Sequence, residues 1–343
     1  AGLQAARAFA STAQALAGTA DDVVMNPALS LDVIAASLPG TYARDQRWAN
    51  GGSSAAADRR TLVSPTRMVV YIDGNGYVLS SQSSLDCDAS ANWDAATYAT
   101  ASNRAGKDFY IYACVPSSGR ELDLILSANS TYPTGYTASN SRKIGGFHCL
   151  CVSVGTISGH DLTGYLQGDI LPMSVWDLLH RPVSAPEGMV WNPGVGHWVD
   201  IYLAGIASGE LVSRNGAAHV TGYTTEKFHW YKFSEWLGRV GKKMLNQHEF
   251  VAASLGSNQG TNIAGSANPV TTGGYSDTAG RRMISDIGCE SCCGVIWQWG
   301  EGDGGGQSSA AWVDAYDAND AGVGGQHYLA PNRPRFGGAW HTG

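Results

Sequence analysis

Short alternating apolar stretches dominate the chain from residue 61 onward. Residues 68–72 and 77–79 flank an Asp-Gly-Asn-Gly sequence, so the pattern predicts a β-hairpin with a tight turn. Further strands are predicted at 108–115, 122–126, 143–154 and 198–206. Many short strands separated by polar loops are typical of an antiparallel sandwich or barrel, so we expect a mostly β protein.

Two helices with clear signals interrupt the strands in the C-terminal half. The first has apolar residues at helical intervals, namely Trp230, Phe233, Leu237 and Val240. The second begins after Asn246, an N-cap residue that is followed three positions later by Glu249, which is the capping-box arrangement. Gly256 marks the end of this helix. Glu249 is therefore better explained as a cap than as a catalytic acid.

The first 60 residues carry a different pattern. Residues 1–17 are Ala-rich and 31–38 have apolar positions at helical spacing, which predicts two short helices, while the polar stretch at 41–60 is predicted as a linker. The spacing of small residues in the first helix fits either an oligomer seam or a surface helix. We assign residues 1–60 to attachment or oligomerisation, 61–170 to a β-sandwich-like stem domain, and 171–343 to an α+β head.

The C-terminal end contains two apolar pieces that bound a long polar region. In 295–299 the alternation places Val295, Trp297 and Trp299 on one face, which predicts a strand. A second strand is predicted at 335–340, with Gly337 and Gly338 inside it. About 35 residues with almost no apolar periodicity separate the two strands, a length that is unusual for a loop without a function.

Composition narrows the class of protein. Only 15% of the residues are charged, whereas the chain has 44 Gly and 11 Trp, a balance that favours a loop-rich extracellular or virion protein. The net charge is −7 and no Lys/Arg run occurs, which argues against nucleic acid or an anionic membrane as partner. No apolar run is long enough to insert into a bilayer.

The seven cysteines are an odd number and do not form the dense pattern of a disulfide scaffold, so we expect most to be reduced. Cys289, Cys292 and Cys293 are compatible with a metal site, a disulfide or buried thiols, and the last is favoured because no further ligand pair lies nearby. Cys149 and Cys151 are two apart on a predicted strand and are expected to share a face as small core side chains.

Other candidate chemistry is weak. Glu301 and Asp303 lie on a Gly-rich turn and are weak calcium candidates, with Asp314, Asp317 and Asp320 further along. Such carboxylates usually belong to a solvated loop, so we expect no metal and no other cofactor. No Ser/His/Asp or Cys/His arrangement and no phosphate-binding loop is identifiable, which favours a binding module over an enzyme.

Six segments resemble a known family. KKMLNQHEFVAASLG (242–256), GVIWQWG (294–300) and RPRFGGAW (333–340) resemble the signatures of the C-type-lectin-fold branch that formylglycine-generating enzymes share with retroelement-diversified variable proteins. YPTGYTASNSRKIGGFHC (132–149), SVWDLLHRPVSAPEGMV (174–190) and WVDIYLAGI (198–206) are similar to the phage major tropism determinants within that branch. The resemblance covers roughly residues 105–343.

The resemblance implies a homotrimeric receptor-binding protein at the tip of a phage tail fibre, with a C-type-lectin-like head. Ligand-binding positions of the diversified surface would begin at Ala339, His341 and Gly343. The scaffold of that surface would comprise Trp297, Trp299, Gly337, Gly338 and Trp340. The sequence ends three residues after Trp340, so we expect most of the variable segment to be absent, either because the chain is incomplete as recorded or because the head is truncated.

The favoured interpretation is a virion adhesin that binds a host cell-surface receptor, protein or glycan, and contacts other tail-fibre or baseplate proteins. Two alternatives stay open. A copper oxidase of the formylglycine-generating kind would need a cysteine pair downstream of the Gly-Gly strand. A structural virion protein would use the lectin-like head only to pack against its neighbours.

Overall fold

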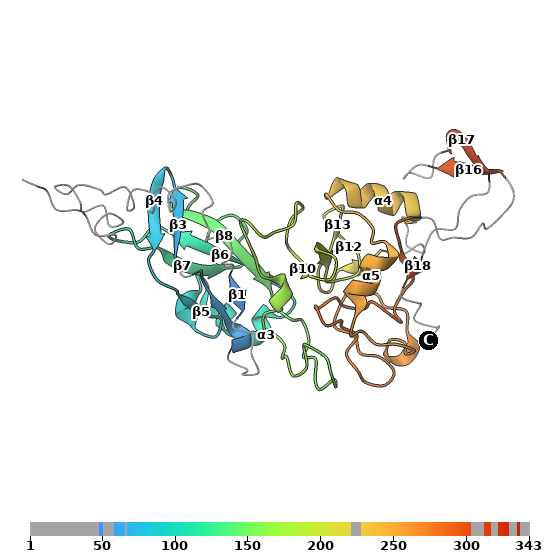
Figure 1. Ribbon diagram of the computed structural model, residues 1–343, viewed down its shortest axis with the longest axis horizontal. Coiled ribbons are helices and arrows are strands. Elements are labelled where there is room, and N and C mark those ends of the chain that lie inside the picture. The colour runs from blue at the N-terminus through green and yellow to red at the C-terminus, as the bar shows by residue number, and fades with distance from the viewer. Residues whose placement is uncertain are drawn as a thin grey trace, which may run out of the picture. The chain divides into compact units, whose positions relative to one another are not determined.

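The computed structural model describes residues 48–50, 58–65, 67–220, 228–302, 312–316, 322–328 and 335–336. The chain divides into two units: unit 1 contains residues up to 100, 109–146 and 175–180, and unit 2 contains 101–108, 147–174 and 181 onward. Both units consist mostly of short strands with few helices (Figure 1), as predicted. The two N-terminal helices predicted within residues 1–38 lie outside the described residues.

The predicted hairpin of unit 1 is confirmed. Strands β3 (Met68–Ile72) and β4 (Asn75–Leu79) pair antiparallel, with Ile72 opposite Asn75. The two residues between the strands, Asp73 and Gly74, have φ values of 49° and 76°. Positive φ at both central positions is the mark of a type I′ turn, whose twist matches that of the flanking strands.

A four-stranded sheet in the order β7-β6-β8-β9 supplies the main strands of unit 1. Its members are β6 (Asp108–Cys114), β7 (Asp123–Ser127), β8 (Ser141–His148) and β9 (Trp176–Asp177). Gly146 lies on β8 where a Cβ would meet the Phe109 carbonyl oxygen at 2.6 Å and the Trp176 ring at 2.7 Å. The two adjacent glycines of β8 therefore let β9 approach closely.

A second sheet of unit 1 has the order β1-β2-β5, and 3-10 turns flank it. Its strands are β1 (Ala49–Asn50), β2 (Thr61–Val63) and β5 (Ser84–Asp86), and the turns are η1 (Asp58–Arg60), η2 (Ser90–Asn92) and η3 (Ala96–Ala99). Part of the predicted 41–60 linker is therefore a paired strand. Buried Trp48, which is 4% exposed, anchors it.

The first half of unit 2 is built from short strands rather than the single strand predicted at 198–206. Its elements are α3 (Ala101–Arg104), η4 (Pro172–Ser174), β10 (Met189–Asn192), β11 (His197–Asp200), β12 (Gly205–Ala207), β13 (Glu210–Val212) and β14 (Ala218–His219). The prediction was wrong because β11 ends at Asp200. The backbone N–H groups of the next two residues, Ile201 and Tyr202, donate to Gly188 O and Ser213 Oγ and do not continue the hydrogen-bond ladder of a strand.

The predicted strand at 143–154 is likewise shorter than expected, because β8 ends at His148. Cys149 makes an isolated bridge with Ile170, and Cys151 follows in a bend. The two thiols therefore do not share the face of one strand, although both are buried as predicted.

The two helices of unit 2 are confirmed as α4 (Trp230–Arg239) and α5 (Gln247–Ser254), with η5 (Ala264–Ser266) beyond them. The capping box is complete: Glu249 N donates to Asn246 Oδ1 at 3.0 Å, and Asn246 N donates to Glu249 Oε2 at 2.9 Å. In the described part of the chain, neither helix is long and apolar enough to cross a membrane.

The C-terminal strands differ partly from prediction. β15 (Gln298–Trp299) pairs antiparallel with β18 (Arg335–Phe336), so the structure contains a short part of each predicted strand. The region between them was predicted as a loop but contains a hairpin, β16 (Trp312–Tyr316) and β17 (Gly322–Tyr328). The sequence pattern missed β17 because its three glycines interrupt the apolar alternation.

Gly256 ends α5 and provides the first test of the fold. Its φ is +77°, and a Cβ there would overlap the Asp286 carboxylate. Gly256→Ala should therefore lower the free energy of unfolding by at least about 2 kcal/mol, because it adds strain and a clash. Gly238→Ala is the matched control. Gly238 lies inside α4 with open space around it, so alanine should raise stability by about 0.5–1 kcal/mol. Equal effects in urea unfolding would contradict this account.

Candidate functional site

Trp297 and Trp299 are the only residues of the predicted binding surface and its scaffold that fall within the described part of the chain. The others lie outside it: Gly337, Gly338, Ala339, Trp340, His341 and Gly343. Strand β18 ends at Phe336, directly before these positions, so the described geometry concerns the base from which the predicted surface would extend.

Arg335 joins the two tryptophans. Its guanidinium lies 5.9 Å from the ring centroid of Trp297 and 5.9 Å from that of Trp299, which is its cross-strand partner. Trp297 is 50% exposed, whereas Val295 is fully buried. The prediction that Val295, Trp297 and Trp299 lie on one face of a strand was therefore wrong for the first two, because β15 begins only at Gln298.

Hydrogen bonds to neighbouring loops fix the position of β15. Gln298 Nε2 donates to Cys292 O at 3.0 Å, and Trp299 Nε1 donates to Phe228 O at 3.4 Å. From α4, Trp230 Nε1 donates to Gly300 O at 2.9 Å. The indole N–H groups of Trp299 and Trp230 thus each donate to a backbone carbonyl, and the two bonds connect β15 and Gly300 with the start of α4.

Strand β18 is held by an aromatic stack. The Phe336 ring lies 4.7 Å from the Phe250 ring of α5, with an interplanar angle of 17°. On its other side Phe336 meets Gly300, where an added Cβ would overlap the ring. The glycine therefore makes room for the phenylalanine, and α5 fixes where β18 begins.

A charged group completes the contact at the start of α5. Lys243 Nζ lies 2.9 Å from Glu249 Oε1 and 3.2 Å from Glu301 Oε2, while Glu301 N donates to Leu245 O at 2.8 Å. The weak calcium candidate Glu301 thus faces an ammonium group, and the other candidate, Asp303, lies outside the described residues. Within the described residues, no group of three or more His, Cys, Asp or Glu is arranged to hold a metal.

The capping glutamate is ionised by its partners. Burial of Glu249 raises the pKa of its carboxyl, but the Asn246 N–H and the Lys243 ammonium outweigh this effect and hold that pKa below its usual value. Hydrogen bonding to Glu249, together with Glu301, in turn raises the pKa of Lys243. The pair is therefore charged at neutral pH.

A chain of buried polar side chains crosses unit 2 and was missed by sequence reasoning. Asp108 Oδ1 lies 2.9 Å from His148 Nδ1, and His148 Nε2 lies 2.9 Å from the Tyr202 hydroxyl. Tyr202 shares a hydrogen bond with Cys151, whose thiol donates to Glu290 Oε1 at 3.4 Å. These residues are far apart in sequence, so no local spacing signals the chain.

The reactive groups in this chain are kept protonated. Burial raises the pKa of Tyr202 and that of Cys151, each well above its ordinary value, and Glu290 adds to both shifts. Glu290 itself pairs with Arg282 at 2.5 Å, with side chains 1% and 4% exposed. The arrangement offers no ionised thiolate, and it suits a structural role better than nucleophilic chemistry.

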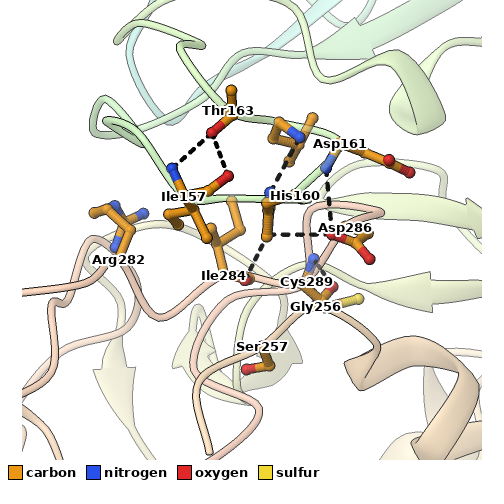
Figure 2. A network of polar contacts seen from close by, with 12 residues as sticks. Ile157, His160, Asp161, Thr163, Gly256, Ser257, Arg282, Ile284, Asp286 and Cys289 are labelled. Atoms are coloured by element: carbon orange, nitrogen blue, oxygen red, sulfur yellow. Dashed lines mark hydrogen bonds and ion pairs between the residues drawn. The ribbon is translucent and has the colours of Figure 1, made fainter.

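A second buried network connects the loop at 157–163 with the loop at 284–289 (Figure 2). His160 Nδ1 accepts from Leu162 N at 3.0 Å, so its Nε2 carries the proton that faces Ile284 O at 3.1 Å and Asp286 Oδ1 at 3.5 Å. Asp286 N donates to Leu255 O at the end of α5. Both ring nitrogens of the histidine thus have hydrogen-bond partners, and Asp286 connects the network to the end of α5.

The cysteines of the Cys-x-x-Cys-Cys sequence are free thiols, as are the other four. Cys289 and Cys292 are buried and Cys293 is half-buried. A hydrogen bond with Cys289 and burial together raise the pKa of Cys292, and burial raises that of Cys293. The predicted burial is confirmed for Cys289 and Cys292, whereas Cys293 is only half-buried.

Fold and site together define a mostly β protein in which Arg335 lies near two tryptophan rings. Residues 56–177 match the family model of the Mtd second domain. The chain is 30% identical over 258 residues to the tail fiber receptor-binding protein of Bordetella phage BPP-1, and the match covers 69% of this chain and 64% of that protein. The chain therefore spans less than two thirds of that relative's length.

Solved structures share the fold. The Major Tropism Determinant I1 variant matches with a TM-score of 0.65 and 24% identity over 86% of this chain and 77% of that chain. The U1 variant matches with a TM-score of 0.65 and 22% identity over 98% and 91%. Taken with the domain match, these findings identify the chain as a relative of the phage major tropism determinants, which confirms the resemblance in its sequence motifs.

Protonation of Glu249 should break its ion pair with Lys243 at the start of α5. Because the folded-state pKa is lowered, its contribution to stability is present above the unfolded value near 4.5 and is lost as pH falls through the lower folded value. Glu249→Gln should therefore cost about 1 kcal/mol at pH 7, and this difference from the parent should be smaller at pH 3.

Glu235→Gln is the control for this experiment, because Glu235 forms an exposed i,i+4 pair with Arg239. It should cost less than about 0.5 kcal/mol at either pH. A Glu249→Gln penalty that is the same at both pH values in urea unfolding would show that the charge of Glu249 does not stabilise α5.

Proposed function

We propose that this chain is a receptor-binding adhesin of a phage tail fibre, which recognises a host cell-surface receptor through a C-terminal surface that begins at Ala339, His341 and Gly343. The observation that carries the proposal is the clamped base of that surface. Phe336 is stacked on α5 and Arg335 is placed between two indoles, immediately before the proposed binding positions. A rigid base lets exposed side chains vary without disturbing the core.

The absence of enzymatic activity belongs to the same proposal. The buried thiols and the buried tyrosine of unit 2 have raised pKa values, which supports recognition rather than nucleophilic catalysis. The relative from Bordetella phage BPP-1 is described as a tail fibre receptor-binding protein. The proposal therefore places the chain in the virion.

A C-type-lectin-like head from residue 171, a homotrimer and attachment through residues 1–60 to other tail-fibre or baseplate proteins complete the proposal. Trimeric presentation would raise a weak single-site affinity through effective concentration. The Gly-Gly sequence at 337–338 fits a strand that meets another backbone closely, as diversified lectin-like surfaces require.

The test uses Fab fragments raised against the full chain and phage particles whose genome encodes it. Electron microscopy should show the Fabs at the tail-fibre tips, and the Fabs should reduce adsorption to host cells at least about tenfold, because they cover the receptor surface. Fabs against the capsid serve as the control and should leave adsorption unchanged.

Two results would contradict the proposal. Tip labelling with normal adsorption would favour a structural virion protein. Labelling elsewhere on the particle, or none, would remove the chain from the fibre tip.

A further inference from the structure

Trp297, Trp299 and Arg335 form what we call the Trp297–Arg335 patch. Trp297 is 50% exposed and Arg335 is exposed, so both side chains are accessible from solvent. Large aromatic side chains are usually buried, and an exposed indole beside a cation has the chemistry of a binding hot spot. Trp299 and Arg335 are paired across β15 and β18, Trp297 lies directly before β15, and the proposed receptor surface follows β18.

The charge of Arg335 distinguishes this patch from a similar one on α4. Arg239 also lies over an indole, that of Trp236 at 5.2 Å, but it is paired with Glu235. Among the described residues, no carboxylate pairs with Arg335. Within the described residues, no carboxylate neutralises the charge of Arg335, whereas Glu235 neutralises that of Arg239 in its own helix.

The patch is also preorganised. Trp299 is hydrogen-bonded to the Phe228 carbonyl, and Gln298 to the Cys292 carbonyl. Phe336, the neighbour of Arg335, is fixed between Phe250 and Gly300. A ligand would meet side chains that have already lost much of their conformational freedom, which lowers the entropic cost of binding.

We infer that the Trp297–Arg335 patch binds an acidic sugar residue of a cell-surface glycan. The C–H face of the sugar ring would pack on the indole of Trp297, and its carboxylate would accept two hydrogen bonds from the guanidinium of Arg335. The 5.9 Å between guanidinium and ring centroid suits a ligand that carries its carboxylate on the ring itself. This inference deepens the proposed function by naming a receptor class for the same surface.

An acidic sugar fits this geometry better than an acidic peptide. Asp and Glu place the carboxylate at the end of a flexible side chain that has no flat apolar face. A uronate or a sialic acid carries both features on one rigid ring, so a single residue satisfies the indole and the guanidinium together and less freedom is lost on binding.

The test measures binding of the full chain to immobilised acidic oligosaccharides and to their methyl esters, which keep the ring but remove the charge. At least one acidic glycan should bind, and its ester should bind at least about tenfold more weakly. Trp297→Ala and Arg335→Gln should each reduce binding at least about tenfold. Binding should also weaken as salt is added.

Matched controls exclude general damage. Arg239→Gln removes the neutralised guanidinium and should leave binding unchanged. Val183→Ala removes an apolar side chain that is fully exposed, at 103%, and should also have no effect. Unchanged thermal unfolding of Trp297→Ala and Arg335→Gln would confirm that lost binding is local.

Three outcomes overturn the inference: no acidic glycan binds above its ester, binding survives both patch substitutions, or an acidic peptide binds through the patch while no glycan does. These outcomes are separable from failure of the proposed function. If Fabs block adsorption but no acidic glycan binds, the adhesin function is retained and only the acidic-sugar inference is rejected. If Fabs have no effect on adsorption, the adhesin function itself is rejected.

Discussion

The ion pair between Lys243 and Glu249 at the start of α5 is the interaction on which the candidate site depends. Glu249 closes the capping box with Asn246. Lys243 pairs with Glu249 and also with Glu301, which lies two residues beyond β15. One turn of this helix also presents Phe250 to Phe336 of β18. A single capped helix thus contacts β18 through Phe336 and the residues directly after β15 through Glu301.

In unit 2 a network of mostly buried polar side chains is separate from the exposed Trp297–Arg335 patch. The buried chain from Asp108 through His148 and Tyr202 to Glu290 satisfies polar groups that would otherwise be costly to bury. Its thiol and phenol are held protonated and inert. The exposed patch, by contrast, offers an indole ring and a guanidinium that no carboxylate of the described residues neutralises.

Local signals in the sequence were sufficient for part of this structure. The turn at Asp73 and the capping box at Asn246 follow from neighbouring residues alone, and both were predicted. The break after Asp200 depends on Gly188 and Ser213, and the position of β15 depends on Phe228, which lies 71 residues away from Trp299. Periodicity cannot encode such contacts. The family resemblance predicted the class of function. The contact of Arg335 with both indoles could not be predicted, because it joins residues that lie more than 30 positions apart in the sequence.

Amide hydrogen exchange on a Phe250→Ala variant tests the central claim that α5 holds the base of the surface. Exchange should accelerate in β15 and β18, because the stack on Phe336 is lost, while β6 and β7 of unit 1 keep the protection of the parent. If 298–299 and 335–336 exchange as slowly as in the parent, the strands are held by other contacts and α5 is not their anchor.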